Sequence, residues 1–100
     1  MRIEVLTVPD CPNGPLAERR LAEALAGRRD VILERRVVAT LAEAERYGMH
    51  GSPTVLVDGC DPFAAPGTPA SLSCRLYRGP DGQAQGVPSA GQLREMLDAW

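Results

Sequence analysis

Apolar residues change their spacing along the chain, and each spacing predicts a different element of structure. Arg2–Val8 is rich in Ile, Val and Leu, which is typical of a central strand buried on both faces. The next apolar positions recur at helical spacing and predict an amphipathic helix that ends at Gly27. Those positions are Ala17, Leu21, Ala24 and Leu25. Val31–Val38 predicts a second strand, which completes a β-α-β unit with parallel strands.

Polar residues mark the starts of two further helices. Thr40, with a glutamate three residues later, is a capping box in which hydroxyl and carboxylate each accept an amide hydrogen bond. A short helix is predicted from there to about Tyr47, ended by Gly48. Ser89, with a glutamine three residues later, predicts a final helix. The apolar stripe of that helix is Leu93, Met96, Leu97 and Trp100.

Two more strands are predicted between these helices. Thr54–Val57 is a third apolar run, and the turn-rich segment Gly59–Pro69 that follows it predicts a loop. Leu72–Arg78 alternates and predicts a fourth strand followed by a turn. Its two faces are Leu72, Cys74 and Leu76 on one side and Ser73, Arg75 and Tyr77 on the other. The order β-α-β-(α)-β-β-α indicates an α/β fold with a four-stranded mixed sheet flanked by helices.

Length, composition and charge limit the class of protein. One hundred residues with 44% hydrophobic and 24% charged residues suit one soluble globular domain over residues 1–100. All eleven basic residues are arginines, yet the net charge is -2 and there is no basic tract, which argues against nucleic-acid binding. The apolar start of the chain is short and interrupted by Glu4. We therefore expect no signal peptide, no membrane contact and a cytoplasmic location.

Cys11 is the residue with the clearest chemical potential. It lies between the first strand and the first predicted helix, where unpaired amides and the helix dipole favour the nucleophilic thiolate. Gly14 leaves the backbone near the sulfur uncovered, and Pro15 fits the first turn of a helix. We expect a reactive thiol at Cys11. The alternative is an inert cysteine packed as a small apolar residue.

The other candidate residues are less clearly defined. Three cysteines argue against a complete disulfide framework. Cys74 shares a face with leucines, which favours core packing, whereas Cys60 is expected to be exposed at the far end of the sheet from Cys11, beyond disulfide reach. His50, the only histidine, either assists Cys11 or is solvated beyond a helix end. No zinc-ligand spacing is present, and no metal or cofactor is expected.

Two motifs resemble those of the thioredoxin-fold family, and the resemblance covers essentially the whole chain. Cys11-Pro12 at the start of the first helix is similar to the dipeptide of glutaredoxins. Gly51–Thr54, with the sequence Gly-Ser-Pro-Thr, is similar to the family's Gly-x-Pro-Thr, in which the proline peptide bond is cis. The chain also resembles small bacterial thioredoxin-family proteins, some of which carry an alkylmercury-lyase label.

The resemblance implies a site made from these two motifs. In the family the cis-proline loop faces the active cysteine, and the residue before the proline, here Ser52, pairs through its backbone with an extended substrate. The implied substrate-binding residues are Pro12, Asn13, Gly14, Ser52, Pro53 and Thr54, with His50 and Cys74 as auxiliary residues. The family's Cys-x-x-Cys motif is changed here, because its fourth position is Gly14. The match is therefore to single-thiol, Cys-x-x-Gly members.

The leading hypothesis is thiol–disulfide exchange with Cys11 as the nucleophile. An external low-molecular-weight thiol would release the mixed disulfide, and the partners would be disulfide-containing proteins or small-molecule thiols. A second hypothesis is capture of a soft metal ion or an organomercurial by Cys11, with or without Cys74. A third is a redox-silent thioredoxin-fold module for protein contact. The sequence leaves these three, and the oligomeric state, open.

Overall fold

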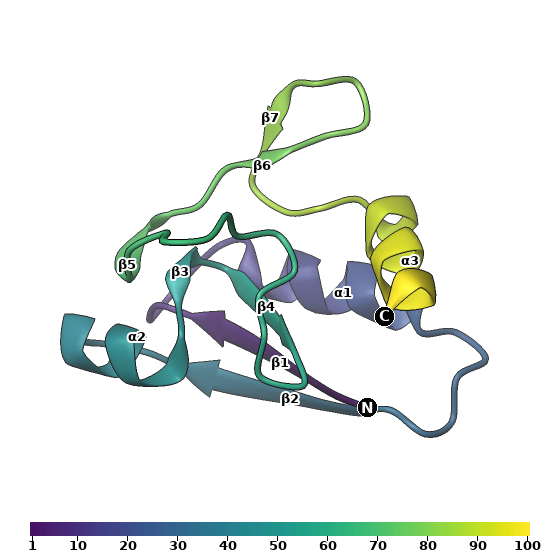
Figure 1. The fold of residues 1–100 in the computed structure, drawn as a ribbon, viewed down its shortest axis with the longest axis horizontal. Helices are drawn as coiled ribbons and strands as arrows, with labels where there is room; N and C mark the ends of the chain where they lie inside the picture. Colours follow the sequence, from purple (N-terminus) through teal and green to yellow (C-terminus); the bar gives the residue numbers. More distant parts are fainter.

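In a computed structural model, which describes all residues from Met1 to Trp100, the central sheet has three strands in the order β2-β1-β4 (Figure 1). These strands are β1 (Arg2–Thr7), β2 (Ile32–Val37) and β4 (Thr54–Val57). β1 runs parallel to β2 and antiparallel to β4, so the sheet is mixed, as predicted.

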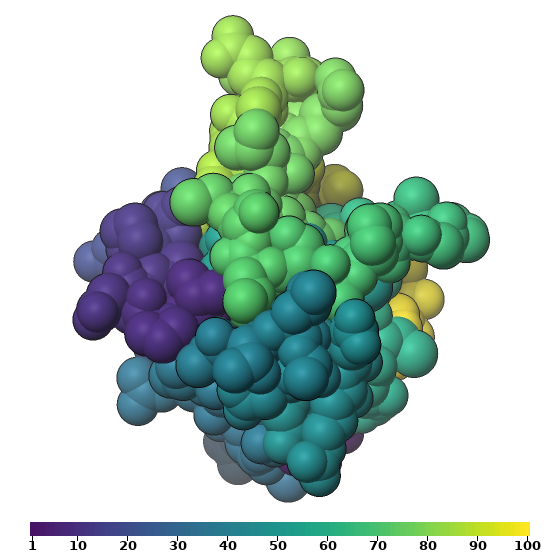
Figure 2. All heavy atoms as spheres, turned by 90° about the vertical axis from the view of Figure 1, so that its left-hand side faces the viewer, coloured from purple at the N-terminus to yellow at the C-terminus, as the bar shows by residue number.

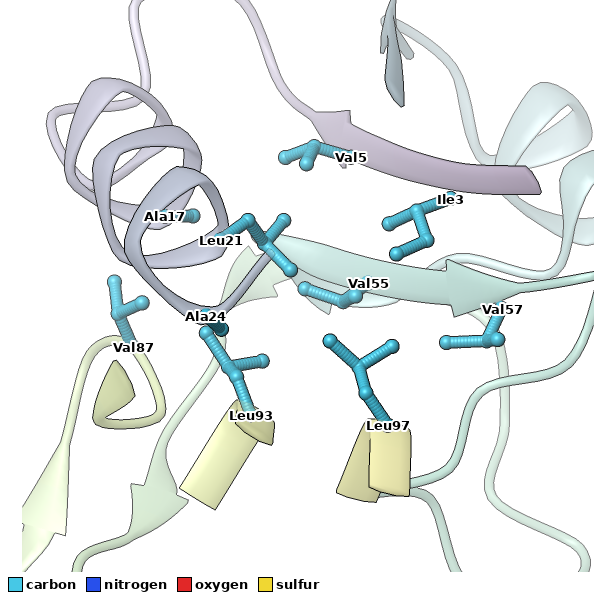
Figure 3. Packing of buried hydrophobic residues seen from close by; sticks show 10 residues of the cluster. All are labelled: Ile3, Val5, Ala17, Leu21, Ala24, Val55, Val57, Val87, Leu93 and Leu97. Atoms are coloured by element: carbon cyan, nitrogen blue, oxygen red, sulfur yellow. The ribbon is translucent and has the colours of Figure 1, made fainter. Parts of the chain in front are cut away.

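Three helices cover the two faces of this sheet: α1 (Gly14–Ala24), α2 (Leu41–Tyr47) and α3 (Ala90–Ala99). On one face, Ile3 and other strand residues pack against Leu21 of α1 and Leu93 of α3 (Figure 3). On the other face, Leu6 packs with Ala44 of α2 in a second, smaller cluster. None of the helices combines the length and the apolar character needed to cross a bilayer.

The prediction that the first strand is buried on both faces is confirmed. Ile3 and Val5 belong to the larger cluster and Leu6 to the smaller one. α1 ends before the predicted Gly27, since Leu25 is its C-cap and Gly27 lies in the following turn with a positive φ of 86°. Gly48 ends α2 as predicted, in the left-handed conformation that glycine adopts readily.

The helix caps also follow the sequence closely. Ser89 and Gln92 form the complete reciprocal capping box at the start of α3. At α2 the Thr40 hydroxyl accepts from the Glu43 amide at 3.2 Å. The Glu43 carboxylate accepts from the amide of Ala39, one residue earlier than the predicted box, so only half of that box is formed as expected.

The predicted fourth strand of the sheet is wrong. Leu72–Arg78 is interrupted, and its parts are β5 (Ser71–Cys74) and β6 (Tyr77–Arg78). β5 pairs in parallel with β3 (His50–Ser52), and β6 pairs with β7 (Ala84–Gln85) across the predicted turn. The physical reason lies at Arg75, whose side chain turns inward to a buried ion pair with Asp61 and breaks the alternation.

Leu72 packs against the smaller cluster as its predicted face implies, but beyond it the predicted faces are reversed. Cys74 is exposed and Leu76 is 72% exposed, so neither packs in the core. Tyr77, expected on the outer face, is only 5% exposed. In α3 the apolar stripe is partly confirmed, because Leu93 and Leu97 are buried whereas Trp100 is 51% exposed.

Candidate functional site

Cys11 lies in the turn that joins β1 to α1. Its amide donates to the Val8 carbonyl at 3.3 Å, and its own carbonyl accepts from the Gly14 amide at 3.2 Å. The helix begins later than predicted, because Asn13 is the N-cap and its carbonyl accepts the first helical bond, from Ala17. The predicted hydrogen bonds from helix amides to the Cys11 sulfur are not formed.

The Cys11 thiol is free and partly exposed, and it lines a surface hollow of about 250 Å³. The hollow lies between the start of α1 and strand β2, which contributes Arg35 and Val37 to its wall. Arg35 pairs with Glu18 at 3.1 Å, so two of the charges at this wall compensate each other. Pro15 and Val37 supply apolar surface beside the sulfur. A small molecule can therefore approach Cys11 from this side.

Gly14, at the position where a dithiol motif has its second cysteine, has a packing role. A Cβ atom at this position would lie 3.2 Å from the Thr7 Cγ2 atom of β1. Such a distance is shorter than an ordinary van der Waals contact, so the glycine permits the close approach of α1 to β1. The departure from Cys-x-x-Cys is therefore coupled to how the first helix sits on the sheet.

The peptide bond between Ser52 and Pro53 is cis, as the family resemblance implies. The Ser52 hydroxyl accepts a hydrogen bond from the Val8 amide at 3.0 Å. Since the Val8 carbonyl holds the Cys11 amide, a single residue fastens the cysteine turn to the cis-proline loop. The two predicted motifs are thus brought together.

The cis-proline loop is not open to an extended substrate, which corrects the expectation for Ser52, Pro53 and Thr54. All three residues are buried, and the Ser52 carbonyl accepts from the Arg75 amide at 3.0 Å. The chain's own β5 occupies this edge of β3, with Cys74 opposite Ser52 in the register. Figure 2 shows the turn that follows β1, in purple, directly beside the segment around β5, in green.

A buried polar network, which the sequence reasoning missed, holds this arrangement. Arg75 donates to both carboxylate oxygens of Asp61, at 2.5 and 3.3 Å, and to the Thr54 hydroxyl at 3.3 Å. The Tyr77 hydroxyl donates to the Pro53 carbonyl at 2.5 Å, and the Arg75 guanidinium lies 4.5 Å from the centre of its ring. The only signal in the sequence was an arginine and a tyrosine on the presumed outer face.

The network also perturbs one titratable group. Burial raises the pKa of the Tyr77 hydroxyl far above its usual value, because desolvation disfavours the phenolate. The positive charge of Arg75 lowers this pKa by a smaller amount, and the Asp61 carboxylate raises it. Tyr77 therefore serves as a neutral hydrogen-bond donor to the cis-proline loop at ordinary pH.

The remaining candidate residues lie elsewhere. His50 contacts the Pro69 carbonyl through Nδ1 at 3.2 Å and lines a separate pocket of about 410 Å³ with Phe63 and Tyr77. Cys60 is exposed, as predicted, and all three thiols are free. No group of three or more His, Cys, Asp or Glu side chains is placed to hold a metal ion.

The site thus consists of the cysteine turn, Cys11 to Gly14, and the buried cis-proline loop beneath it. Within the turn, Pro12 is exposed, Asn13 is half-buried and Gly14 is buried. Ser52 contacts the segments that carry Cys11 and Cys74, through its hydroxyl on one side and its β5 pairing on the other. No protein-family model matches the chain, nor does any curated protein or solved structure.

Proposed function

We propose that this protein has a thioredoxin-like fold and catalyses thiol–disulfide exchange through a single thiol, that of Cys11. The observation that carries the proposal is the fastening of the cysteine turn to a cis-proline loop through Val8 and Ser52. The β1-α1-β2 unit, with β4 antiparallel to β1, supports the same assignment. The partial exposure of Cys11 leaves its sulfur accessible to a reactant.

The reaction proceeds in two exchanges that balance. The Cys11 thiolate attacks one sulfur of a substrate disulfide, and the other sulfur leaves as a thiolate that takes up a proton from water. An external low-molecular-weight thiolate then attacks the substrate sulfur of the mixed disulfide, which frees Cys11. The substrate ends as a thiol and a new mixed disulfide with the external thiol. Cys11 itself is neither oxidised nor reduced over the cycle.

The substrate class follows from the hollow rather than from the cis-proline loop. Because β5 covers that loop, an extended peptide has no strand edge to pair with at Ser52. The hollow beside Cys11 has a volume of about 250 Å³, and Pro15 and Val37 give it an apolar wall. We therefore assign low-molecular-weight mixed disulfides as the substrates, with glutathione-type thiols as the reductant.

Single-cysteine chains provide the test. Three chains, each retaining only Cys11, Cys60 or Cys74, are assayed for glutathione-dependent reduction of hydroxyethyl disulfide and for their rate of reaction with 5,5′-dithiobis(2-nitrobenzoate). The Cys11-only chain is expected to keep the turnover of the native protein, and the other two to lose it. The exposed Cys60 is the matched control, because it is an exposed cysteine in the segment after β4, outside the cysteine turn and the cis-proline loop.

Two results would overturn the proposal. One is undiminished turnover after Cys11→Ser. The other is a Cys11-only chain whose turnover is no higher than that of the Cys60-only chain. Far-UV circular dichroism of each chain establishes that the comparison is made between folded proteins.

A further inference from the structure

The outer edge of β2 is unpaired and unusually apolar for a free strand. β2 is the last strand on its side of the sheet, as Figure 1 shows. Its residues Ile32 and Val37 are 59% and 60% exposed, and Leu33 is 39% exposed. A regular strand edge with exposed apolar side chains is a template for pairing with another strand.

The hydrogen bonds to β1 identify which backbone groups of β2 are free. The amides of Ile32 and Val38 donate to carbonyls at the two ends of β1. The backbone amide and carbonyl groups of successive residues in a strand point to opposite sides. Those of the even-numbered residues of β2 therefore point toward β1. The amides and carbonyls of Leu33, Arg35 and Val37 therefore point outward, toward a strand that would lie alongside.

The side chains of β2 alternate between the two faces of the sheet. Arg35 pairs with Glu18 of α1, which places the odd-numbered residues on the α1 face. Arg36 lies over the ring of Tyr47 in α2, at 4.1 Å, which places the even-numbered residues on the other face. Glu34 is on that second face and pairs with Arg2.

We propose that two copies of this chain pair antiparallel through β2, with Arg35 of one copy opposite Arg35 of the other. Residues that lie opposite one another in the two strands must be on the same face of the sheet. A symmetric antiparallel pair can therefore be centred on one residue, but not on the midpoint between two neighbouring residues. Centred on Arg35, the register sets Glu34 opposite Arg36 on one face. It sets Leu33 opposite Val37 on the other.

Charge complementarity selects this register. Glu34 and Arg36 form two equivalent cross-strand ion pairs, and the outward amides of Leu33, Arg35 and Val37 find carbonyl partners. The two opposed arginines at the centre each have a Glu18 carboxylate beside them. Centring the pair on Glu34 instead would oppose two glutamates, and it would set Leu33 against Arg35.

The proposed pairing also changes the wall of the hollow that Cys11 lines. Val37 lines that hollow, and in the proposed register Leu33 of the second copy lies opposite Val37 on the same face. The second copy thus extends the apolar wall beside the thiol. This inference rests on the geometry and the charges of the β2 edge and stands whether or not Cys11 performs disulfide exchange.

Sedimentation equilibrium and cross-linking test the pairing. The native chain is expected to form a species of twice its 10.7 kDa mass. For cross-linking, Cys11, Cys60 and Cys74 are replaced by Ser, and Arg35→Cys is introduced. Opposed Cα atoms of a hydrogen-bonded antiparallel pair lie about 5.5 Å apart, within disulfide reach, so mild oxidation is expected to join the two copies. Glu34→Cys in the same background is the control, since its copies would lie roughly 8 Å apart.

Two charge and polarity changes complete the test. Glu34→Arg opposes like charges in both ion pairs and is expected to weaken dimerisation by about tenfold, whereas Glu45→Arg on α2 leaves it unchanged. Val37→Lys is expected to weaken it as well, and Leu76→Lys, at a more exposed leucine away from β2, is not. A chain that stays monomeric at all concentrations, or a cross-link at position 34 instead of 35, overturns the proposal.

Discussion

Two regions of the chain are stabilised by different physics. The N-terminal unit β1-α1-β2 is held by apolar packing on α1 and by a regular parallel ladder. The segment from Asp58 to Pro88 has short strands, and its buried part is fastened by hydrogen bonds and an ion pair around Arg75. Apolar packing requires apolar residues at regular intervals, and this period is visible in the sequence. A polar network instead depends on partners that are distant in the chain. The first kind of region is predictable from pattern and the second is not.

The difference has an energetic side as well. Each apolar contact is weak and the loss of one side chain is spread over many neighbours. A buried polar group, in contrast, loses its compensation entirely when one partner is removed. The segment around β5 should therefore be the more sensitive of the two regions to single polar substitutions.

The largest effect is expected from Arg75→Met. The change removes the guanidinium and leaves the Asp61 side chain, only 4% exposed, without its partner. Breaking a buried pair from one side costs about 3–5 kcal/mol, and we expect a loss of that size in the free energy of unfolding. Urea denaturation followed by circular dichroism measures it.

Two companion variants sharpen this prediction. Arg78→Met removes an arginine side chain whose one hydrogen bond is exposed, and its effect is expected to stay within about 0.5 kcal/mol. Asp61→Asn added to Arg75→Met removes the uncompensated charge and is expected to restore part of the loss. A loss after Arg75→Met no larger than that after Arg78→Met would show that the network does not fasten the segment.

The next effect is expected from Leu21→Ala in the N-terminal region. Leu21 is fully buried between α1 and the sheet, with Leu93 and Leu97 among its cluster (Figure 3). Truncation leaves a cavity and costs about 3 kcal/mol in the free energy of unfolding. Leu41→Ala, at a leucine that is 51% exposed, is the control and should cost far less. Equal losses for the two leucines would contradict the assigned core.

A smaller effect with a distinctive pH dependence is expected from Tyr77→Phe. The Pro53 carbonyl loses its donor, which costs about 1–3 kcal/mol at neutral pH. Burial raises the pKa of Tyr77 in the folded state, while in the unfolded state it titrates near its usual value of about 10. Above that pH the unfolded chain releases the proton first, so the native protein loses stability as the pH rises.

The phenylalanine variant lacks this alkaline loss. The difference in unfolding free energy between the two proteins should therefore shrink as the pH increases from about 9 to 11. Denaturation curves at several pH values measure it. A difference that stays constant would mean that the Tyr77 hydroxyl is not buried as the structure has it.

The sequence predicted the elements that have local causes. The burial of Ile3 and Leu6 on opposite faces, the left-handed Gly48 and the cap at Ser89 all follow from neighbouring residues. The start of α1 was set too early. It was set at Cys11-Pro12, whereas the first helical hydrogen bond is accepted by the Asn13 carbonyl.

The candidate site was predictable only in part. Cys11 and the cis bond before Pro53 were reached from the motifs, and the hydrogen bond between Val8 and Ser52 shows that they meet. The pairing of β5 over the cis-proline loop was not predicted. It depends on Arg75 leaving the strand pattern to pair with Asp61 in a distant loop, and alternation cannot reveal a partner that the chain supplies from elsewhere.

The smallest effect is expected from Thr40→Ala at a helix cap, and it is compared with the same substitution at Thr68 in the loop before β5. The Thr40 hydroxyl caps α2 by accepting from the Glu43 amide, and its loss costs about 1 kcal/mol. Thr68→Ala removes an exposed hydroxyl that donates to the Ala65 carbonyl, and no helix depends on it, so a few tenths of a kcal/mol are expected. Thermal unfolding of the two variants side by side measures the difference. If Thr68→Ala proved the costlier, the loop before β5 would contribute more local order than its exposed hydrogen bonds indicate. The contrast drawn above would then be wrong for that loop.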